Sequence, residues 1–117
     1  MLAKENRLRL KNDFKRVFEK GRFYQEGFLS MKVVFNSGEI SRFGFIVSKK
    51  ISKKAATRNK IKRRLRESVR LKFKNGLIKN GFDAVIFTRS EIIDKNFFEI
   101  DKVITILFKK ARILRRL

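Results

Sequence analysis

The sequence predicts a single α+β domain with elements in the order α-β-β-β-α-β-α. Residues 57–74 and 96–114 show the 3.6-residue periodicity of amphipathic helices. Residues 28–35 and 42–48 alternate between apolar and polar side chains, as half-buried strands do. Residues 82–88 form a short continuous apolar run, which is typical of a buried strand.

The composition fits one folded domain that needs an anionic partner. The chain has 117 residues, which suffices for one domain with a single core. Its hydrophobic content of 43% argues against disorder, although 37% of the residues are charged. Lys and Arg number 32 against 11 acidic residues, which gives a net charge of +21. We expect nucleic acid as the partner, with an anionic membrane surface as the alternative.

The residue types that are missing exclude several kinds of chemistry. The chain has no Cys and no His, which excludes disulfides, Cys/His zinc sites, thiol nucleophiles and His-based catalytic triads. No apolar run approaches the roughly 18 residues that a membrane span needs. The N-terminal segment also lacks the apolar core of a signal peptide. We therefore expect a cytoplasmic protein, with no membrane and no small-molecule substrate among its partners.

A short first helix is expected at residues 13–20. Its ends carry typical capping residues, Asn12 or Asp13 at the start and Gly21 at the end. Phe14 and Phe18 are four residues apart and therefore share a face with Val17. This periodicity predicts that both aromatic side chains belong to the core.

The first strands are expected at residues 22–25, 28–35 and 42–48. In the second strand, alternation places four apolar residues on one side (Leu29, Met31, Val33 and Phe35) and Ser30 and Lys32 on the other. In the third, Phe43, Phe45 and Val47 share a face, and Gly44 leaves room on the opposite face. We expect the second and third strands to pair as an antiparallel hairpin around a turn at residues 36–38.

The long helix at residues 57–74 and the strand at 82–88 complete a β-α-β unit with parallel strands. Ile61, Leu65 and Val69 recur every four residues and form an apolar stripe, which Phe73 extends. Turn signals follow at 75–76 and 80–81. The general rule predicts a right-handed connection between the two strands.

The last helix is expected to begin with a capping box, in which Asn96 and Glu99 satisfy each other's backbone groups. Apolar residues keep helical spacing from Ile100 to Leu114, and cations crowd the C-terminal end, where the helix dipole favours them. We expect this helix to cover the sheet. The alternative is a basic amphipathic helix that lies on a membrane.

The outer side of the long helix carries charges of one sign. Helical geometry groups five polar residues away from the apolar stripe: Asn59, Lys62, Arg63, Arg66 and Arg70. Glu67 is the only acid between Ile51 and Arg70. A solvated helix face normally mixes both signs, whereas a one-sign face repels itself unless a polyanion neutralises it. The pattern therefore favours RNA or DNA as the partner.

The same stretch resembles the signature of the bacterial ribonuclease P protein subunit. The matching residues are Ser48-Lys49-Lys50, then Lys54-Ala55, then Arg58-Asn59-x-x-Lys62-Arg63-x-x-Arg66-Glu67. The resemblance extends over nearly the whole chain, but only residues 47–67 are specific. Members of this family are small basic proteins that join a catalytic RNA to remove the 5′ leader of precursor tRNA. The resemblance implies one RNA-binding domain at 1–117, with a mixed four-stranded sheet and a left-handed β-α-β crossover, as in the ribosomal protein S5 domain 2-like fold.

The resemblance also implies two binding surfaces. Contact with the catalytic RNA falls on Lys49, Lys50, Lys54, Arg58, Asn59, Lys62, Arg63 and Arg66. Helical geometry adds Arg70, which lies on the same face of the long helix. Contact with the single-stranded leader falls on Phe14, Phe18, Met31, Lys32 and Arg89. Aromatic rings can stack on unpaired bases while nearby cations bind phosphates. Phe14 and Phe18 thus have two interpretations, as core residues and as cleft residues.

No catalytic residue or metal ligand is assigned to this chain. Its acidic residues are scattered, and the densest group lies around the start of the last helix: Glu91, Asp94, Glu99 and Asp101. Compensation of the helix dipole explains that group. We therefore expect the partner RNA to perform catalysis, with Mg²⁺ held by RNA phosphates and water and no cofactor bound by the protein. The alternative is a ribosomal or general RNA-binding protein without a role in cleavage.

Overall fold

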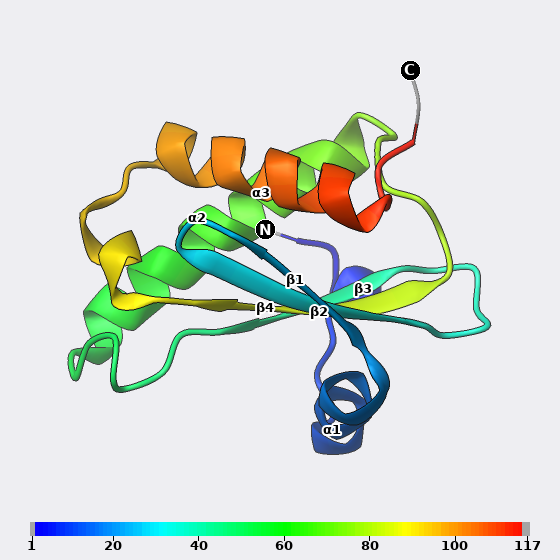
Figure 1. The fold of residues 1–117 in the computed structure, drawn as a ribbon, viewed down its shortest axis with the longest axis horizontal. Coiled ribbons are helices and arrows are strands. Elements are labelled where there is room, and N and C mark those ends of the chain that lie inside the picture. Colours follow the sequence, from blue (N-terminus) through cyan, green and yellow to red (C-terminus); the bar gives the residue numbers. More distant parts are fainter. Residues whose placement is uncertain (1, 116–117) are drawn as a thin grey trace.

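A mixed four-stranded sheet divides the molecule, with α1 on one face and α2 and α3 on the other (Figure 1). The structure is a computed structural model that describes residues 2–115. Its elements are α1 (Lys11–Lys20), β1 (Arg22–Glu26), β2 (Leu29–Phe35), β3 (Arg42–Ile46), α2 (Ala55–Lys74), β4 (Phe82–Thr88) and α3 (Phe97–Ala111), with short 3₁₀ helices at Lys4–Asn6 and Ser90–Asp94. This order confirms the predicted α-β-β-β-α-β-α arrangement.

The strand order β1-β2-β4-β3 shows that the predicted hairpin between β2 and β3 was wrong. β4 lies between them, antiparallel to β2 and parallel to β3. A central strand needs apolar side chains on both faces, and β4 supplies them: Val85 faces α1, whereas Ala84 and Ile86 face α2 and α3. The parallel pairing of β3 with β4 around α2 confirms the β-α-β unit, and its left-handed sense remains what the resemblance implies.

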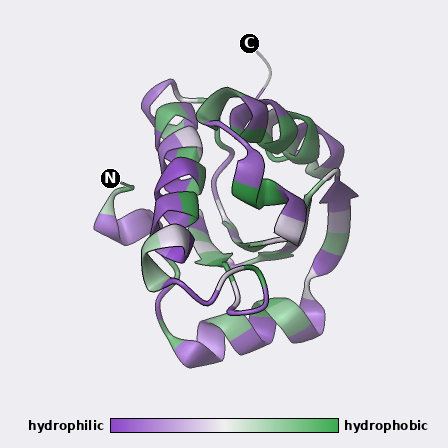
Figure 2. Ribbon diagram, turned by 90° about the vertical axis from the view of Figure 1, so that its left-hand side faces the viewer, coloured by the Kyte–Doolittle hydropathy of each residue, from purple (hydrophilic) through white to green (hydrophobic). Residues whose placement is uncertain are grey.

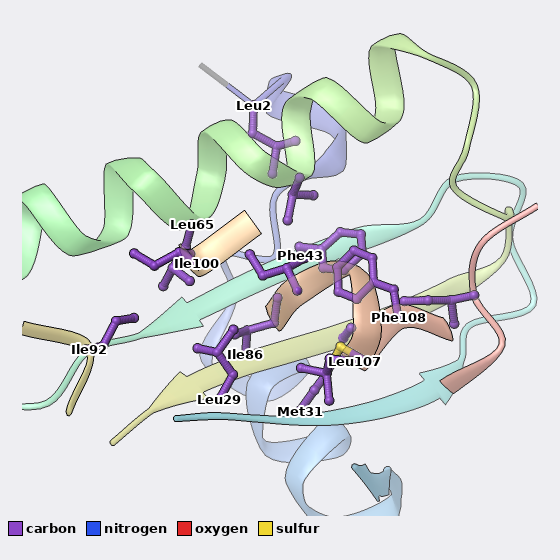
Figure 3. Close-up of a cluster of buried hydrophobic side chains, with 14 of the residues drawn as sticks. Leu2, Leu29, Met31, Phe43, Leu65, Ile86, Ile92, Ile100, Leu107 and Phe108 are labelled. Atoms are coloured by element: carbon purple, nitrogen blue, oxygen red, sulfur yellow. The ribbon is translucent and has the colours of Figure 1, made fainter. Parts of the chain in front are cut away.

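The main core lies between the sheet and the helices α2 and α3 (Figure 3). The predicted stripe of α2 is confirmed, because Ile61, Leu65 and Val69 are all buried. Phe73 extends the stripe and meets Phe43 of β3 edge to face, with 5.7 Å between the ring centroids. This burial leaves the opposite side of α2 free to carry charge.

A smaller cluster holds α1 against the other face of the sheet. Leu8, Val17 and Val85 are buried there, and Phe14 and Phe18 pack against them. Gly44 has the predicted role, because a Cβ atom at this position would overlap the ring of Phe14. The close approach of α1 to β3 therefore depends on glycine at residue 44.

The ends of α1 differ from the prediction. The helix begins at Lys11 with Leu10 as its N-cap, and no side chain caps it, so the expected capping by Asn12 or Asp13 was wrong. Gly21 ends the helix with φ −72°, outside the left-handed region. Glycine is needed there for space, because a Cβ atom would overlap the carbonyl oxygen of Val17.

The other helix ends follow the sequence signals more closely. Gly76 has φ +68° after α2, and the capping box of Asn96 and Glu99 is present in α3. However, α3 ends at Ala111 because Arg112 turns into the left-handed conformation with φ 58°. The predicted helical run to Leu114 is therefore too long. Within residues 2–115, no helix has the length and apolar character needed to cross a membrane.

Candidate nucleic-acid interface

The outer side of α2 brings together most of the residues that the sequence assigns to RNA binding. Asn59 and Arg63 are exposed, and Arg66 is half-buried. A hollow of about 640 Å³ lies along this face, lined by these three residues together with Ala56 and Glu67. Figure 2 shows bands of hydrophilic colouring along α2, which lies beside α3. One rigid helix thus sets the spacing of the cationic groups.

The N-terminal end of α2 adds further positive charge. Lys49 and Lys50 are exposed in the turn after β3, and Lys54 is the N-cap residue of α2. The first turn of the helix contains no acid. Because a helix N-terminus carries about half a positive elementary charge, these lysines strengthen a field that already attracts anions.

Arg58 has a structural task in addition to its predicted one. Its Nη1 atom donates hydrogen bonds to the backbone oxygens of Ser52 (2.9 Å) and Lys53 (3.0 Å). These bonds fix the loop that precedes α2 and therefore position the neighbouring lysines. In the described part of the chain, the other N–H groups of this guanidinium have no hydrogen-bond partner.

Arg70 lies against an acid of its own helix. Its Nε and Nη2 atoms donate to the two carboxylate oxygens of Glu67, at 2.6 and 3.0 Å. This hydrogen bonding lowers the pKa of Glu67 and raises the pKa of Arg70. Within residues 2–115, no carboxylate pairs with Lys62, Arg63 or Arg66. The positive charge of this face is therefore concentrated on the N-terminal side of Arg70.

Aromatic rings form a second patch on the face of the sheet beside α1. The centroid of Phe87 in β4 lies 5.9 Å from that of Phe18 and 6.3 Å from that of Phe23. Lys32 Nζ lies 5.8 Å from the centroid of the Phe18 ring and donates a 2.7 Å hydrogen bond to the Phe18 backbone oxygen. Phe23 is 51% exposed. The patch thus combines accessible rings with a fixed ammonium group.

Phe23 and Phe87 were missed at the sequence level, although alternation contains the signal. Phe23 pairs with Lys32 across the sheet, and Lys32 pairs with Val85 two residues before Phe87. Directly opposed residues point to the same face, as do residues two apart in one strand. Once the strand order is known, both aromatic residues therefore fall beside Lys32.

The remaining predicted leader contacts divide into three cases. Met31 is 0% exposed in the main core, on the face opposite Lys32, so its assignment to a cleft was wrong. Phe14 and Phe18 pack against the smaller cluster, as periodicity predicts, and both remain partly exposed. Arg89 is exposed after β4, beside the side-chain amide of Gln25. The prediction for Met31 was wrong because adjacent residues of a strand point to opposite faces, and Met31 is adjacent to Lys32.

Two acidic residues, Asp83 and Glu99, have structural roles. Buried Asp83 accepts hydrogen bonds from Arg42, Arg16 and Asn36. Burial would raise the pKa of Asp83, but these donors outweigh it and hold the pKa below its ordinary value. Glu99 belongs to the capping box of α3. Among residues 2–115, no three acidic side chains gather in a way that could hold a metal ion.

Comparison with known proteins gives a consistent set of relatives. The family model described as Ribonuclease P matches residues 2–112. The ribonuclease P protein component of Clostridium botulinum strain Loch Maree is 36% identical over 110 residues, which cover 94% of this chain and 97% of that protein. The component of Syntrophomonas wolfei is 39% identical over 116 residues, which cover 99% and 95%.

Solved structures show the same likeness. The RNase P protein of Staphylococcus aureus superimposes with a TM-score of 0.84 at 27% identity, covering 96% of this chain and all (100%) of that one. The RNase P protein of Thermotoga maritima gives a TM-score of 0.78 at 31% identity, with 89% of this chain and 96% of that one covered. The likeness therefore extends over nearly the whole fold.

Proposed function

Because this chain belongs to the ribonuclease P family, we propose that it binds the catalytic RNA of a ribonuclease P holoenzyme and the 5′ leader of precursor tRNA. Binding at both places promotes endonucleolytic removal of the leader, in the cytoplasm. The observation that carries the proposal is the cationic face of α2, where Arg63 and Arg66 line a hollow without a carboxylate partner among the described residues, while Glu67 in the same hollow pairs with Arg70.

The face of α2 suits a folded RNA for two physical reasons. A guanidinium group can fork two phosphate oxygens, and Arg63 and Arg66 lie three residues apart on one side of the helix. Lys49, Lys50 and Lys54 add point charges at the N-terminal end, where the helix dipole has the same sign. A polyanion would relieve the mutual repulsion of these groups and gain affinity by releasing counterions.

The aromatic patch beside α1 suits an unpaired strand such as a leader. Phe18, Phe23 and Phe87 offer ring faces and edges to bases, and Lys32 offers a charge to the backbone. Stacking of this kind tolerates any sequence, because every base has a flat face. Arg89, which is exposed two residues after Phe87, adds a further positive charge at the end of β4.

Catalysis is assigned to the RNA. The acids at the start of α3 have structural tasks, Glu99 in the helix cap and Asp101 in a pair with Lys72 of α2. Mg²⁺ in the reaction would then be bound by RNA phosphates and water. The family match supports this proposal over the alternative of a ribosomal or general RNA-binding protein.

The first test removes the two arginines of the α2 face. Arg63→Ala/Arg66→Ala should weaken binding to the catalytic RNA about tenfold or more, because each loses a charge-assisted contact. The slope of log K against log salt should become shallower by about 0.9 for each lost phosphate contact. Filter-binding titrations at several salt concentrations measure both quantities. Lys11→Ala/Lys102→Ala removes the same charge from exposed sites outside α2, and an equal loss in this control would reject the assignment.

The second test concerns the leader. Phe18→Ala and the more exposed Phe23→Ala should weaken binding of precursor tRNA to the reconstituted holoenzyme, while binding of mature tRNA stays unchanged. One lost stacking contact is worth about 1–3 kcal/mol. Circular dichroism must first show that Phe18→Ala is folded, because Phe18 also packs in the smaller cluster. Equal losses for both tRNAs in the Phe23→Ala variant would contradict a leader site.

A further inference from the structure

A separate groove of about 580 Å³ lies where β1 begins, β2 ends and α3 gives way to the C-terminal segment. The cationic side chains that line it, and two of its aromatic ones, could contact a ligand: Lys20, Arg22, Tyr24, Phe35, Lys79 and Arg112. None of them belongs to the face of α2 or to the aromatic patch beside α1. Phe35 pairs with Phe82 at the start of β4, whereas Arg89 follows the end of this strand. The groove and Arg89 are therefore separated by a seven-residue strand, about 20 Å.

Two aromatic side chains of neighbouring strands, Tyr24 and Phe35, line this groove. Phe35 is 86% exposed, more than any other large hydrophobic residue described in the structure. Tyr24 lies on the same side and carries the guanidinium of Arg22 at 5.8 Å from its ring centroid. An exposed ring contributes little hydrophobic stabilisation to the fold, but it provides a flat face for a ligand. A ring next to a guanidinium group is suited to stack on a nucleobase.

Among the described residues, the charged side chains that line the groove are all positive. No acid is among its lining residues, and an adjoining hollow of about 760 Å³ shares Lys79 and Arg112 and adds Lys109 and Arg115. The C-terminal dipoles of α1 and α3 account for cations on those helices. They do not account for Arg22, which begins a strand, or for Lys79, which lies in the loop before β4.

Backbone pairing fixes the wall that carries these cations. The amide of Lys79 donates to the oxygen of Ile113 at 2.9 Å, and the amide of Arg115 donates to the oxygen of Leu77 at 2.7 Å. These bonds join the loop before β4 to the segment after α3. The backbone beneath Lys79 and Arg112 is therefore held in place before any ligand arrives, which lowers the entropic cost of binding.

We propose that this groove binds an unpaired segment of RNA, with a base stacked on Phe35 or Tyr24 and phosphates on Arg22, Lys79 and Arg112. A duplex would not fit these features, because its bases are stacked on each other and cannot reach the rings. The inference rests on the proposed function only in taking RNA as the partner. It adds a third RNA contact, on the face of the sheet where Tyr24 and Val33 pack against the main core, opposite the aromatic patch beside α1.

The test uses the full chain and a single-stranded oligouridine of eight nucleotides. NMR titration of the ¹⁵N-labelled protein should shift the amides around Phe35, Lys79 and Arg112. Phe35→Ala should weaken binding at the groove at least about fivefold, because a stacked base is lost. Lys79→Ala should reduce the salt slope by about 0.7, the value for one phosphate contact of a single strand. Phe98→Ala is the matched control, since Phe98 is 80% exposed on α3 and lies outside the groove.

The titration is repeated in the Arg63→Ala/Arg66→Ala variant, which separates the two proposals. Shifts at the groove should persist there even when binding to the catalytic RNA is lost. The groove proposal is overturned if the shifts occur only on α2 or beside Phe18, or if Phe35→Ala behaves like Phe98→Ala. It is also overturned if an RNA duplex shifts the groove as strongly as oligouridine does. If phosphatidylglycerol vesicles change the amide chemical shifts at the groove and oligouridine does not, the groove proposal is overturned in favour of a membrane surface.

Discussion

Glu67 reduces the positive charge of the α2 face because its carboxylate forms an ion pair with Arg70. In Glu67→Gln, the guanidinium of Arg70 loses its anionic partner and becomes available to phosphates. We expect tighter binding of the catalytic RNA at low salt, with a salt slope steeper by about 0.9. Filter binding at several salt concentrations measures the change.

The control for this substitution is Glu19→Gln in α1, which removes the same charge from another exposed helical pair, that with Lys15. If affinity rises equally in both variants, only net charge matters. If Glu67→Gln binds more weakly than the unaltered chain, Glu67 instead orients Arg70 toward the RNA. Either result would contradict the moderating role.

Single residues also show what the sequence could and could not predict about the site. The α2 face was predictable because Asn59, Arg63 and Arg66 share one helix, whose periodicity fixes their relative directions. The partners of Arg58 and Arg70 depend on a loop conformation and on side-chain rotamers, which no local pattern determines. The error at Met31 was avoidable, since alternation already separates it from Lys32.

At the scale of elements, one partly buried charged pair joins α2 to α3. Lys72 Nζ, on a side chain that is only 8% exposed, lies 2.7 Å from Asp101 Oδ1, and Ser68 Oγ donates to the same oxygen at 2.5 Å. Burial would raise the pKa of Asp101, but these two donors hold it below its ordinary value of 3.8. The stability that this carboxylate contributes is therefore present above that value and lost as the pH falls through the lower pKa of the folded state.

The two partners of this pair should respond differently to substitution. Asp101→Asn leaves the buried ammonium of Lys72 without an anion and should cost about 1–3 kcal/mol, less than a fully buried pair because Asp101 is partly exposed. Lys72→Met should cost less, since the methionine fills the same space and Asp101 can reach water. Urea unfolding followed by circular dichroism measures both free energies of unfolding. The opposite order would show that the packing of Lys72 matters more than its charge.

The elements themselves were predicted more accurately than their pairing. Residues 82–88 were predicted as a strand with the bounds that β4 has, because Gly81 and the apolar run are local signals. The position of β4 between β2 and β3 depends on contacts between distant segments. Asp83 illustrates this, since its place inside an apolar strand is explained by bonds from Arg16, Arg42 and Asn36, which are 67, 41 and 47 residues away in the chain.

At the scale of the whole molecule, the net charge of +21 opposes the compact state. We expect the melting temperature to rise by several degrees when NaCl increases from about 0.05 to 0.5 M, because salt screens this repulsion. Sodium sulfate at equal ionic strength should raise it further if the anion binds the cationic surfaces. Calorimetry gives both values. A melting temperature that falls with salt would mean that internal ion pairs, such as that of Arg42 with Asp83, outweigh the repulsion.

The central place of β4 determines when a chain growing on a ribosome can fold. β1 and β2 can pair once residues 22–35 have emerged, but β3 has no neighbouring strand until residues 82–88 follow. At about 5–20 residues per second, the interval from β3 to β4 lasts a few seconds. During that time the cationic segment of α2 emerges from the ribosome. The apolar side of α2 cannot yet pack on a complete sheet, because β4 has not been made. We therefore expect a nascent chain to expose the basic segment of α2 to nucleic acid before the apolar side of that segment can pack on the finished sheet.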